Sequence, residues 1–318
     1  MLNRRDFLKT ASLAAMAPSL HWLSCNSDPI LPIIDTHQHL WDLDLFPLKW
    51  VKPPLDRNFL MEDYQKAIEG QGVVKTIYME VAVPPVFRRK EAEWALGLCK
   101  DPGNLMVGAV IKADPTLPEF ESEIRSLATN PYLKGIRYSF KSAEEILLPQ
   151  VIQNIRLLGE LGLSFDLNLH PRLLQFGNQL LGECQDTRFV LNHCGGADPI
   201  AFFPKEKEAP REPQHDREQW QKEMERLAQR ANIICKISGI VDNVGNYPLT
   251  AADLAPIINH CLEVFGPDRA IFAGDWPVCL RNMSLARWIT TLKEVVASRS
   301  LADQRKLFHD NAAAFYGV

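Results

Sequence analysis

The sequence predicts an α/β protein, a single-domain (β/α)8 TIM barrel behind a short N-terminal extension. Eight short apolar runs alternate with segments of helical periodicity, and this alternation is typical of βαβ units that build a parallel sheet. A chain of 318 residues has room for one such barrel, which takes about 250 residues. The first apolar run ends in Asp35-Thr36-His37-Gln38-His39 and not in a glycine-rich phosphate loop, which favours a closed barrel over an open doubly wound sheet.

The predicted strands are rich in Val, Ile and Leu and are bounded by polar residues. In chain order they lie at residues 33–36, 73–81, 105–111, 133–138, 163–169, 188–191, 233–237 and 270–273. Between them, apolar residues recur at spacings of three and four, which predicts amphipathic helices. The most regular of these segments are 146–161, 218–230, 254–265 and 283–296.

Two stretches interrupt the alternation of strands and helices. Residues 41–57 are rich in Leu, Pro and Trp, and residues 202–216 are rich in Pro, Lys and Glu. Each follows a strand that carries histidines, so we expect both to form loops over the catalytic face of the barrel. They are candidates for a substrate lid.

The first 28 residues resemble a twin-arginine export signal. Arg4 and Arg5 precede an apolar stretch that is too short to span about 30 Å of hydrocarbon. A surface amphipathic helix is the alternative interpretation. We therefore expect residues 29–318 to form the barrel and the protein to be exported to the periplasm. Leu23-Ser24-Cys25 is similar to a lipoprotein processing site, and a lipid anchor at Cys25 is the one membrane contact that the sequence indicates.

Composition favours a globular protein with a small-molecule partner. Hydrophobic residues make up 46% of the chain and charged residues 23%, which is ordinary for a protein with a sizeable core. The net charge is −4 without a long basic run, so nothing indicates a nucleic-acid partner. The six cysteines after Cys25 form no Cys-x-x-Cys pair, and we expect buried free thiols.

Ionisable residues stand at the ends of most predicted strands. His37 and His39 are two apart in an extended segment, so both imidazoles can point to one face. The corresponding residues after later strands are Glu80, Arg137, His170, His193 and Asp275. Strand ends of a barrel converge on one mouth, and charges buried there are costly unless they are paired or bind a metal. The pattern indicates a catalytic site, the alternative being scattered residues that bond to the backbone.

Four motifs carry a resemblance to a known family. They are Ile34-Asp35-Thr36-His37-Gln38-His39-Leu40-Trp41, Leu191-Asn192-His193-Cys194-Gly195-Gly196, Lys236-Ile237-Ser238-Gly239 and Phe272-Ala273-Gly274-Asp275-Trp276-Pro277. In this order they resemble the amidohydrolase-2 family, in particular its sugar-lactonase branch that includes L-fuconolactonase and L-rhamnonolactonase. The resemblance extends from about Ile33 to Val318.

The resemblance implies a hydrolase that opens a cyclic ester, most closely a sugar-acid lactone. Asp275 would be the base that activates water, while His37, His39 and His193 polarise the carbonyl or hold a metal. The expected metal set is His37, His39 and Asp275, with one weakly bound Zn or Mn ion or none required. Burial of the carboxylate would raise its pKa, and metal coordination would lower the pKa of the water, so that the two values approach each other. Arg137 stands where binuclear relatives carry a modified lysine, so a binuclear centre is not expected.

Further residues could contact the substrate. Arg137 could anchor a carboxylate or hydroxyls through its guanidinium, or it could instead form a salt bridge with Glu80. The other candidate substrate contacts are Glu80, His170, Arg172, Trp41 and Trp276, and Trp50 is a third indole that could stack on a sugar ring. The alternatives to a lactonase are a non-oxidative decarboxylase of the same broad family and a non-catalytic barrel that binds a sugar acid.

Overall fold

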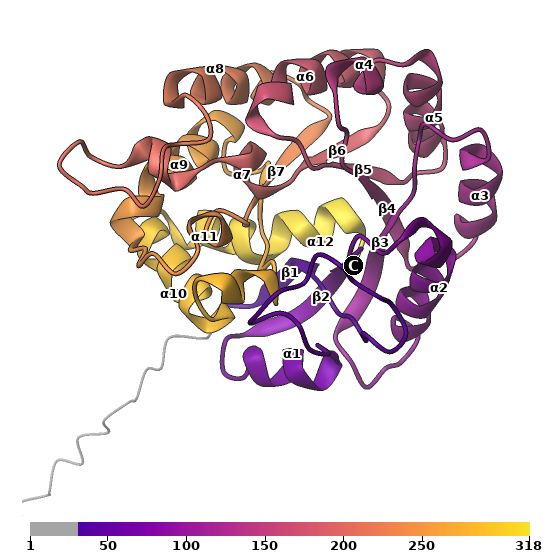
Figure 1. Ribbon diagram of the computed structural model, residues 1–318, viewed down its shortest axis with the longest axis horizontal. Coiled ribbons are helices and arrows are strands. Elements are labelled where there is room, and N and C mark those ends of the chain that lie inside the picture. The colour runs from indigo at the N-terminus through magenta and orange to yellow at the C-terminus, as the bar shows by residue number, and fades with distance from the viewer. Residues whose placement is uncertain (1–30) are drawn as a thin grey trace, which may run out of the picture. The chain divides into compact units, whose positions relative to one another are not determined.

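A computed structural model describes residues 31–318, and these residues form one closed unit built around a parallel sheet. The eight strands pair in chain order, each parallel to the next, so the predicted (β/α)8 barrel is confirmed (Figure 1). The strands are β1 Ile33–Gln38, β2 Val73–Met79, β3 Met106–Lys112, β4 Leu133–Tyr138, β5 Ser164–Leu167, β6 Arg188–Leu191, β7 Ile233–Ile237 and β8 Ala270–Phe272. The predicted export signal and Cys25 lie outside the described residues.

Helices surround the barrel, as the periodicity predicts (Figure 1). They are α1 Met61–Ala67, α2 Arg88–Leu98, α3 Phe120–Leu127, α4 Ala143–Ile146, α5 Pro149–Glu160, α6 Leu174–Glu183, α7 His193–Gly196, α8 Arg217–Ala228, α9 Ala251–Phe265, α10 Leu285–Val296, α11 Leu301–Arg305 and α12 Asn311–Tyr316. Local sequence fixes several starts. The Asp216 carboxylate, for example, accepts a hydrogen bond from the Gln219 amide and caps α8. No helix between residues 31 and 318 is long and apolar enough to cross a membrane.

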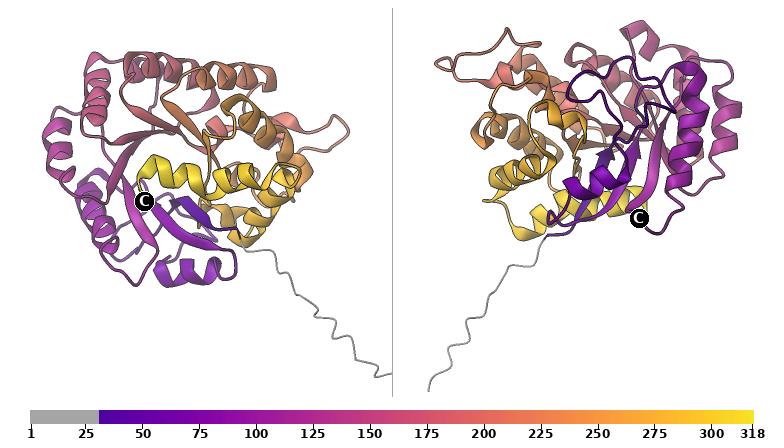
Figure 2. Two further views of the ribbon diagram at one scale, coloured as in Figure 1. Left: turned by 180° about the vertical axis from the view of Figure 1, so that it is seen from behind. Right: turned by 60° about the horizontal axis from the view of Figure 1, so that its bottom comes forward.

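The core has two parts. The larger part lies between the strands and the surrounding helices. The smaller part fills the barrel interior at the end where the strands begin, with inward-facing residues such as Ile34, Val110 and Ile271. Ala312 and Tyr316 of α12 pack on this inner cluster, so α12 closes the end of the barrel opposite the strand carboxyl ends. Figure 2 shows α12, in yellow, lying across the barrel when the molecule is seen from behind. The mouth at the other end stays free for a site.

The seam between β1 and β8 is closed by a set of specific contacts. Asp275 donates its amide to the His37 carbonyl at 2.8 Å, and His39 donates its amide to the Trp276 carbonyl at 2.8 Å. Asp35 accepts hydrogen bonds from the amides of Gly274 and His37 at 2.7 and 3.1 Å. These contacts bring the His37-Gln38-His39 segment directly beside Asp275.

A shift in register changes which β1 side chains face inward. Asp35 pairs with Thr76 but Gln38 pairs with Tyr78, so β1 advances three residues where β2 advances two. A β-bulge of this kind redirects the side chains that follow it, and bulges are common beside active sites. His37 is thereby completely buried within the mouth of the barrel.

Candidate active site

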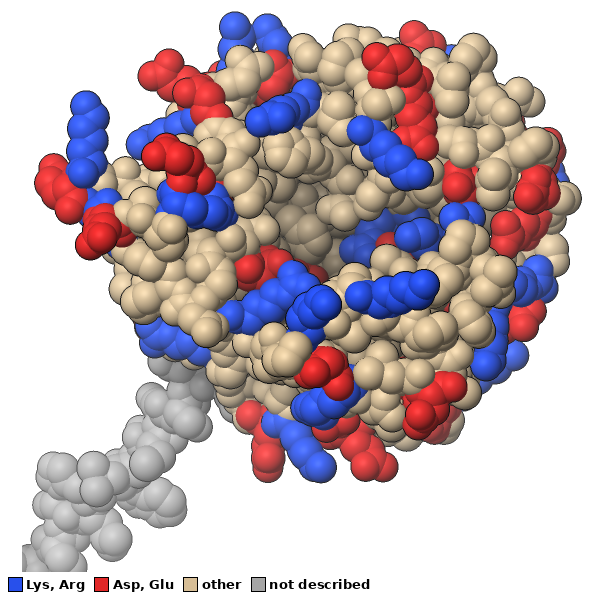
Figure 3. Space-filling view, in the orientation of Figure 1, with Lys and Arg blue, Asp and Glu red and all other residues tan. Residues whose placement is uncertain are grey.

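A cavity of about 490 Å³ opens at the carboxyl ends of the strands. Figure 3 shows the hollow at the centre of this face, with both basic and acidic residues around it. The segments after β1, β2, β4, β5, β6, β7 and β8 all contribute to its walls. Its titratable or charged lining residues are His39, Arg137, His170, His193, Asp242, Asp275 and Arg281. A single cavity therefore collects side chains that are far apart in the sequence.

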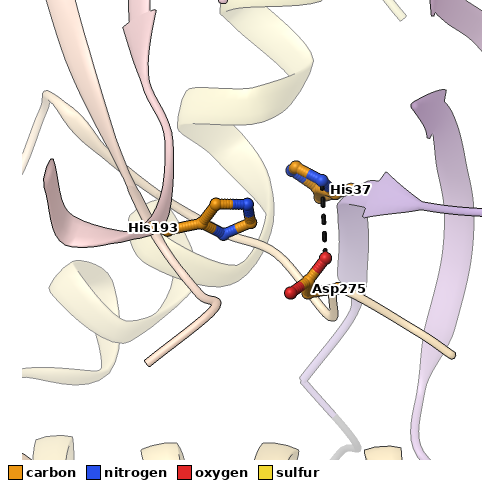
Figure 4. Close-up of side chains that lie close together, drawn as sticks. All are labelled: His37, His193 and Asp275. Carbon is orange, nitrogen blue, oxygen red and sulfur yellow. Dashed lines mark ion pairs between the residues drawn. The ribbon is translucent and has the colours of Figure 1, made fainter. Parts of the chain in front are cut away.

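Three polar atoms from β1 and β8 converge at the floor of this cavity. His37 Nε2 and His39 Nε2 are 3.2 Å apart. Asp275 Oδ1 lies 3.5 Å from His37 Nε2 and 3.3 Å from His39 Nε2. Figure 4 shows Asp275 next to His37, with His193 facing them from the other side. The imidazoles and the carboxylate that the sequence singled out are thus brought together.

Their hydrogen-bond partners show that all three atoms present lone pairs. His39 Nδ1 lies 2.9 Å from the Met79 carbonyl, which can only accept, so Nδ1 carries the proton and Nε2 is an acceptor. Arg137 can only donate, so its contact of 3.2 Å makes His37 Nε2 an acceptor as well. Two imidazole nitrogens and a carboxylate oxygen therefore face one another, an arrangement that a cation or an added proton would stabilise.

The pKa shifts at the site indicate which groups are charged. Burial lowers the pKa of His37 well below its usual value, and the nearby His193 and Lys236 lower it further. Burial lowers the pKa of His193 to about 4, although the charge of Asp275 opposes this. For Asp275, burial raises the pKa, but His193, His39 and Arg137 outweigh it and the pKa is lowered. At neutral pH the site thus holds neutral His37 and His193 beside an ionised Asp275.

His193 is placed by strained backbone and a glycine. His193 and Cys194 have φ values of 55° and 50°, and Gly195 and Gly196 also have positive φ. The His193 Nδ1 atom lies 3.0 Å from Ser238 Oγ, while its ring passes so close to Gly239 that a Cβ atom there would be 2.0 Å from Nδ1. The Ser238-Gly239 pair after β7 therefore holds the ring and leaves room for it.

Arg137 and Glu80 form a buried pair beside the histidines. Arg137 Nε donates to Glu80 Oε1 at 2.6 Å, and Nη2 donates to the Glu80 carbonyl at 2.7 Å. Burial opposes ionisation of Glu80, but Arg137 and Lys112 outweigh it and lower the pKa of this carboxyl. Arg137 lines the cavity, whereas Glu80 does not. The salt bridge considered for Arg137 is therefore present, and Glu80 orients Arg137 instead of contacting a ligand in the cavity.

The remaining sequence candidates divide into wall and core residues. His170 lines the cavity, while Arg172 is exposed and lines a neighbouring depression. Trp41 and Trp276 are buried in the core, where Trp41 donates to the Arg57 carbonyl and Trp276 packs on Phe59. Neither can stack on a ligand from there, which corrects that expectation.

The two interrupting loops reach the cavity through single residues. Trp50 from residues 41–57 lines it, so this is the indole available to a ligand, and Trp41 supports it edge to face. Gln214 from residues 202–216 forms part of the opposite wall.

Sequence reasoning missed several residues at the mouth. Asp242 and Asn243 lie in the turn after β7, and Arg281 lies in the turn after β8. They stand several residues beyond their strands and belong to no motif. Their positions shortly after Ser238-Gly239 and after Asp275 are the signals that could have indicated them.

A divalent metal fits this donor set. Ligands about 2.0–2.1 Å from a tetrahedral zinc ion lie about 3.3 Å from one another, which matches the triangle of His37, His39 and Asp275. Ligand atoms of His37, His193 and Asp275 also lie within 4.8 Å of one another. An ion bound here would require Arg137 to release His37 Nε2. Both three-residue sets share His37 and Asp275, and His39 or His193 completes them.

An eight-stranded barrel with histidines and an aspartate converging at its mouth defines a class of α/β-barrel enzymes that act through strand-end residues. The chain belongs within that class to the amidohydrolase family, whose model (Amidohydro_2, amidohydrolase) matches residues 34–318. The resemblance in the sequence motifs is thereby confirmed, and the family supports a hydrolase.

The chain is also similar to individual proteins over nearly its whole length. The chain is 29% identical to the uncharacterized protein y4mH of Sinorhizobium fredii, over 91% of this chain and 99% of that protein. It is 25% identical to an L-fucono-1,5-lactonase of Burkholderia multivorans, over 90% and 96% of the two chains. A crystal structure of a zinc-bound amidohydrolase from Burkholderia multivorans superimposes with a TM-score of 0.78 at 22% identity, covering 90% of this chain and 99% of that one. The last similarity concerns the fold.

Proposed function

We propose that this protein hydrolyses an uncharged sugar-acid lactone by attack of water on the lactone carbonyl, with Asp275 as the base. The observation that carries the proposal is the ionised Asp275 held 3.3–3.5 Å from two imidazole nitrogens at the floor of a polar cavity. Curated relatives named as lactonases support the type of bond.

The side chains of the site have distinct tasks in this reaction. Asp275 takes the proton of the attacking water as the new C–O bond forms. With Ser238 Oγ donating to Nδ1, His193 would carry its proton on Nε2 and would donate it to the carbonyl oxygen. Arg137 holds His37 in place and adds positive charge near the developing oxyanion. A lowered pKa makes Asp275 a weak base, and a bound divalent ion would compensate by making the water more acidic.

The cavity walls favour an uncharged polyhydroxylated substrate. Two carboxyl groups and two guanidinium groups line the cavity, and Arg137 already pairs with Glu80. Asn168, Gln214 and Asn243 offer amides to hydroxyl groups, and Trp50 offers an apolar ring face.

A serine mechanism finds no support in the described residues. Ser139 is the only serine or cysteine that lines the cavity, and it accepts a hydrogen bond from the Asn168 amide at 3.0 Å. No base lies beside it to activate the hydroxyl.

The test is proton release in weakly buffered indicator solution from a panel of aldonolactones. We expect hydrolysis by the purified protein and a loss of at least about 100-fold in kcat for Asp275→Asn, the range expected when a general base is removed. Asp186→Asn, an exposed carboxylate at the opposite end of the barrel, serves as the matched control. A chelator arm measures the need for metal.

Other outcomes separate the alternatives. Release of CO2 from a carboxylic acid without lactone hydrolysis would establish the decarboxylase. Binding of a sugar acid without any turnover would establish a non-catalytic binding barrel. Equal lactonase rates in the wild type and Asp275→Asn would exclude Asp275 as the base.

We also propose that the protein is exported by the twin-arginine route to the periplasm. The support is the Arg4-Arg5 pair before a short apolar stretch. A reporter fused behind residues 1–30 should be exported, and replacing both arginines with lysine should keep it in the cytoplasm. A wild-type fusion that stays in the cytoplasm would contradict export.

Metabolic labelling with a fatty acid, compared between the full chain and Cys25→Ala, tests the lipid anchor.

A further inference from the structure

Asp242 is a second carboxyl group in the active-site cavity, and the mechanism above does not use it. It begins the short turn Asp242–Val244 that follows β7, and it lines the cavity together with Asp275. Its side chain is only 14% exposed. Within residues 31–318 its one charged partner is Arg281, whose Nη1 lies 3.7 Å away, beyond hydrogen-bond distance. The carboxyl is therefore mostly buried, free of a side-chain donor and open to the cavity.

Opening a lactone requires a proton donor for the leaving ring oxygen, and a protonated carboxyl group can supply that proton. As the acyl C–O bond breaks, the ring oxygen departs as an alkoxide, which is a strong base and a poor leaving group unless it is protonated. Asp275 has then just received the proton of the water and faces the new carboxyl group. A separate acid on another wall can protonate the ring oxygen at the moment it leaves.

We propose that Asp242 is the general acid that protonates the ring oxygen of the departing alkoxide. This inference rests on the proposed lactone hydrolysis. Water forms the new C–O bond and gives a proton to Asp275, the ring C–O bond breaks, and the ring oxygen takes the proton of Asp242. The product carboxylic acid then ionises, and Asp275 gives up the proton that it took from water. One of these two protons returns Asp242 to its acid form, and the other is released. No oxidant or further reactant is needed.

Burial, together with the neighbouring Asp275, favours the acid form of Asp242. Burial raises the pKa of Asp242 to about 7, the negative charge of Asp275 contributes, and Arg281 opposes the shift. The titratable or charged groups near it are Asp275, Cys279 and Arg281, all after β8, while Arg211 bonds to the adjacent Asn243 carbonyl at 2.8 Å and pairs with Asp198. Asp242 and Asp275 line the same cavity from the turns after β7 and β8, so an acid and a base can act on one substrate from two walls.

The expected pH dependence follows from these directions. Asp242 acts when protonated, so kcat should fall as the pH rises through about 7. The wild-type profile should therefore have a basic limb, and Asp242→Asn should remove it.

The experiment measures kcat and KM between pH 4 and 8 by pH-stat, with spontaneous hydrolysis subtracted, for wild type, Asp242→Asn and the control Asp186→Asn. On an aldonolactone we expect kcat of Asp242→Asn to fall about 100-fold, with KM nearly unchanged. On dihydrocoumarin, whose phenolate leaves without protonation, the loss should be less than about tenfold. Circular dichroism and thermal melting verify that the variant is folded.

Several results would overturn the assignment. An unchanged kcat and a retained basic limb in Asp242→Asn would exclude an acid role, and a rise in KM alone would make Asp242 a substrate-binding residue. If the wild type does not hydrolyse dihydrocoumarin, the pH profile on the aldonolactone decides alone. If the wild type hydrolyses no lactone, the proposed function fails and this inference fails with it. Hydrolysis with unaltered Asp242→Asn kinetics overturns only the inference.

Discussion

At the scale of single residues, unfavourable backbone conformations gather around the cavity. Ala82, His193, Cys194 and Asp275 are the non-glycine residues between 31 and 318 with positive φ, from 50° to 55°. Three of them line the cavity, and Cys194 directly follows His193. Such conformations cost about 1–3 kcal/mol each and persist where the surrounding structure enforces them. Packing and hydrogen bonds elsewhere in the fold therefore offset the strain that orients His193 and Asp275.

Gly239→Ala should inactivate the protein without unfolding it. A Cβ atom at this position would lie 2.0 Å from His193 Nδ1, so the ring must leave Ser238. We expect kcat on a lactone to fall by about 100-fold or more, since misplacement of a catalytic group by about 1 Å has such an effect. Gly70→Ala is the matched control, because Gly70 has a φ of 72° and open space around its Cβ position. Equal kcat values in the two variants would show that Gly239 does not place His193.

At the scale of elements, β5 and β7 carry an ion pair inside the barrel. Lys236 Nζ lies 2.7 Å from Asp166 Oδ2, and both side chains are completely buried. The second oxygen of Asp166 and both polar side-chain atoms of Asn192 have no hydrogen-bond partner among residues 31–318. Buried polar groups of this kind are commonly satisfied by ordered water. The Lys236–Asp166 pair is thus a charged element inside an otherwise largely apolar barrel interior.

Removing one partner of this pair should destabilise the barrel strongly. Lys236→Met leaves the Asp166 carboxylate buried and unpaired, which costs about 3–5 kcal/mol. The double variant Lys236→Met with Asp166→Leu should recover most of that loss, because no buried charge is then left without a partner. Urea unfolding of the wild type, both single variants and the double variant measures the coupling. Additive losses in the double variant would contradict a paired interaction.

At the scale of the whole molecule, the buried imidazoles link stability to pH. The unfolded chain protonates histidine near pH 6.5, whereas folded His193 does so only at about 4. The unfolded state therefore binds more protons between these values, and the free energy of unfolding falls as the pH drops through this window. Water in the cavity reduces the effect, so we expect a loss of roughly 2 kcal/mol from His193. Urea unfolding at pH 7 and 4.5 should show a smaller loss for His193→Asn than for the wild type. Equal losses would contradict this linkage.

Metal binding is the second prediction for the whole molecule. After chelation, the protein should bind about one equivalent of zinc or manganese and melt at a higher temperature, because an ion that binds only the folded state stabilises it. His37→Asn should lose both effects. His170→Asn should retain them, since His170 lines the same cavity outside the converging triangle. Elemental analysis and thermal melting are the readouts, and an unshifted melting temperature would count against a resident ion.

Much of this protein is determined by the sequence alone. The alternation of strands and helices and the placement of ionisable residues at strand ends follow from local periodicity, which single-sequence patterns record directly. For this reason the strands, the barrel and a ring of strand-end residues could be predicted, and the resemblance to the amidohydrolase family selected His37, His39, His193 and Asp275 from that ring. The pairing of Arg137 with Glu80 was foreseen only as one of two alternatives.

Only the tertiary structure decided how the walls of the site are built. Trp41 and Trp276 carry the same indole as Trp50, yet packing buries two of them and leaves the third at the cavity. Asp242 and Arg281 meet at the mouth because the turns after β7 and β8 are neighbours in space. Burial, pairing and the resulting pKa values depend on the surroundings of a side chain in three dimensions, and a linear pattern does not encode those surroundings.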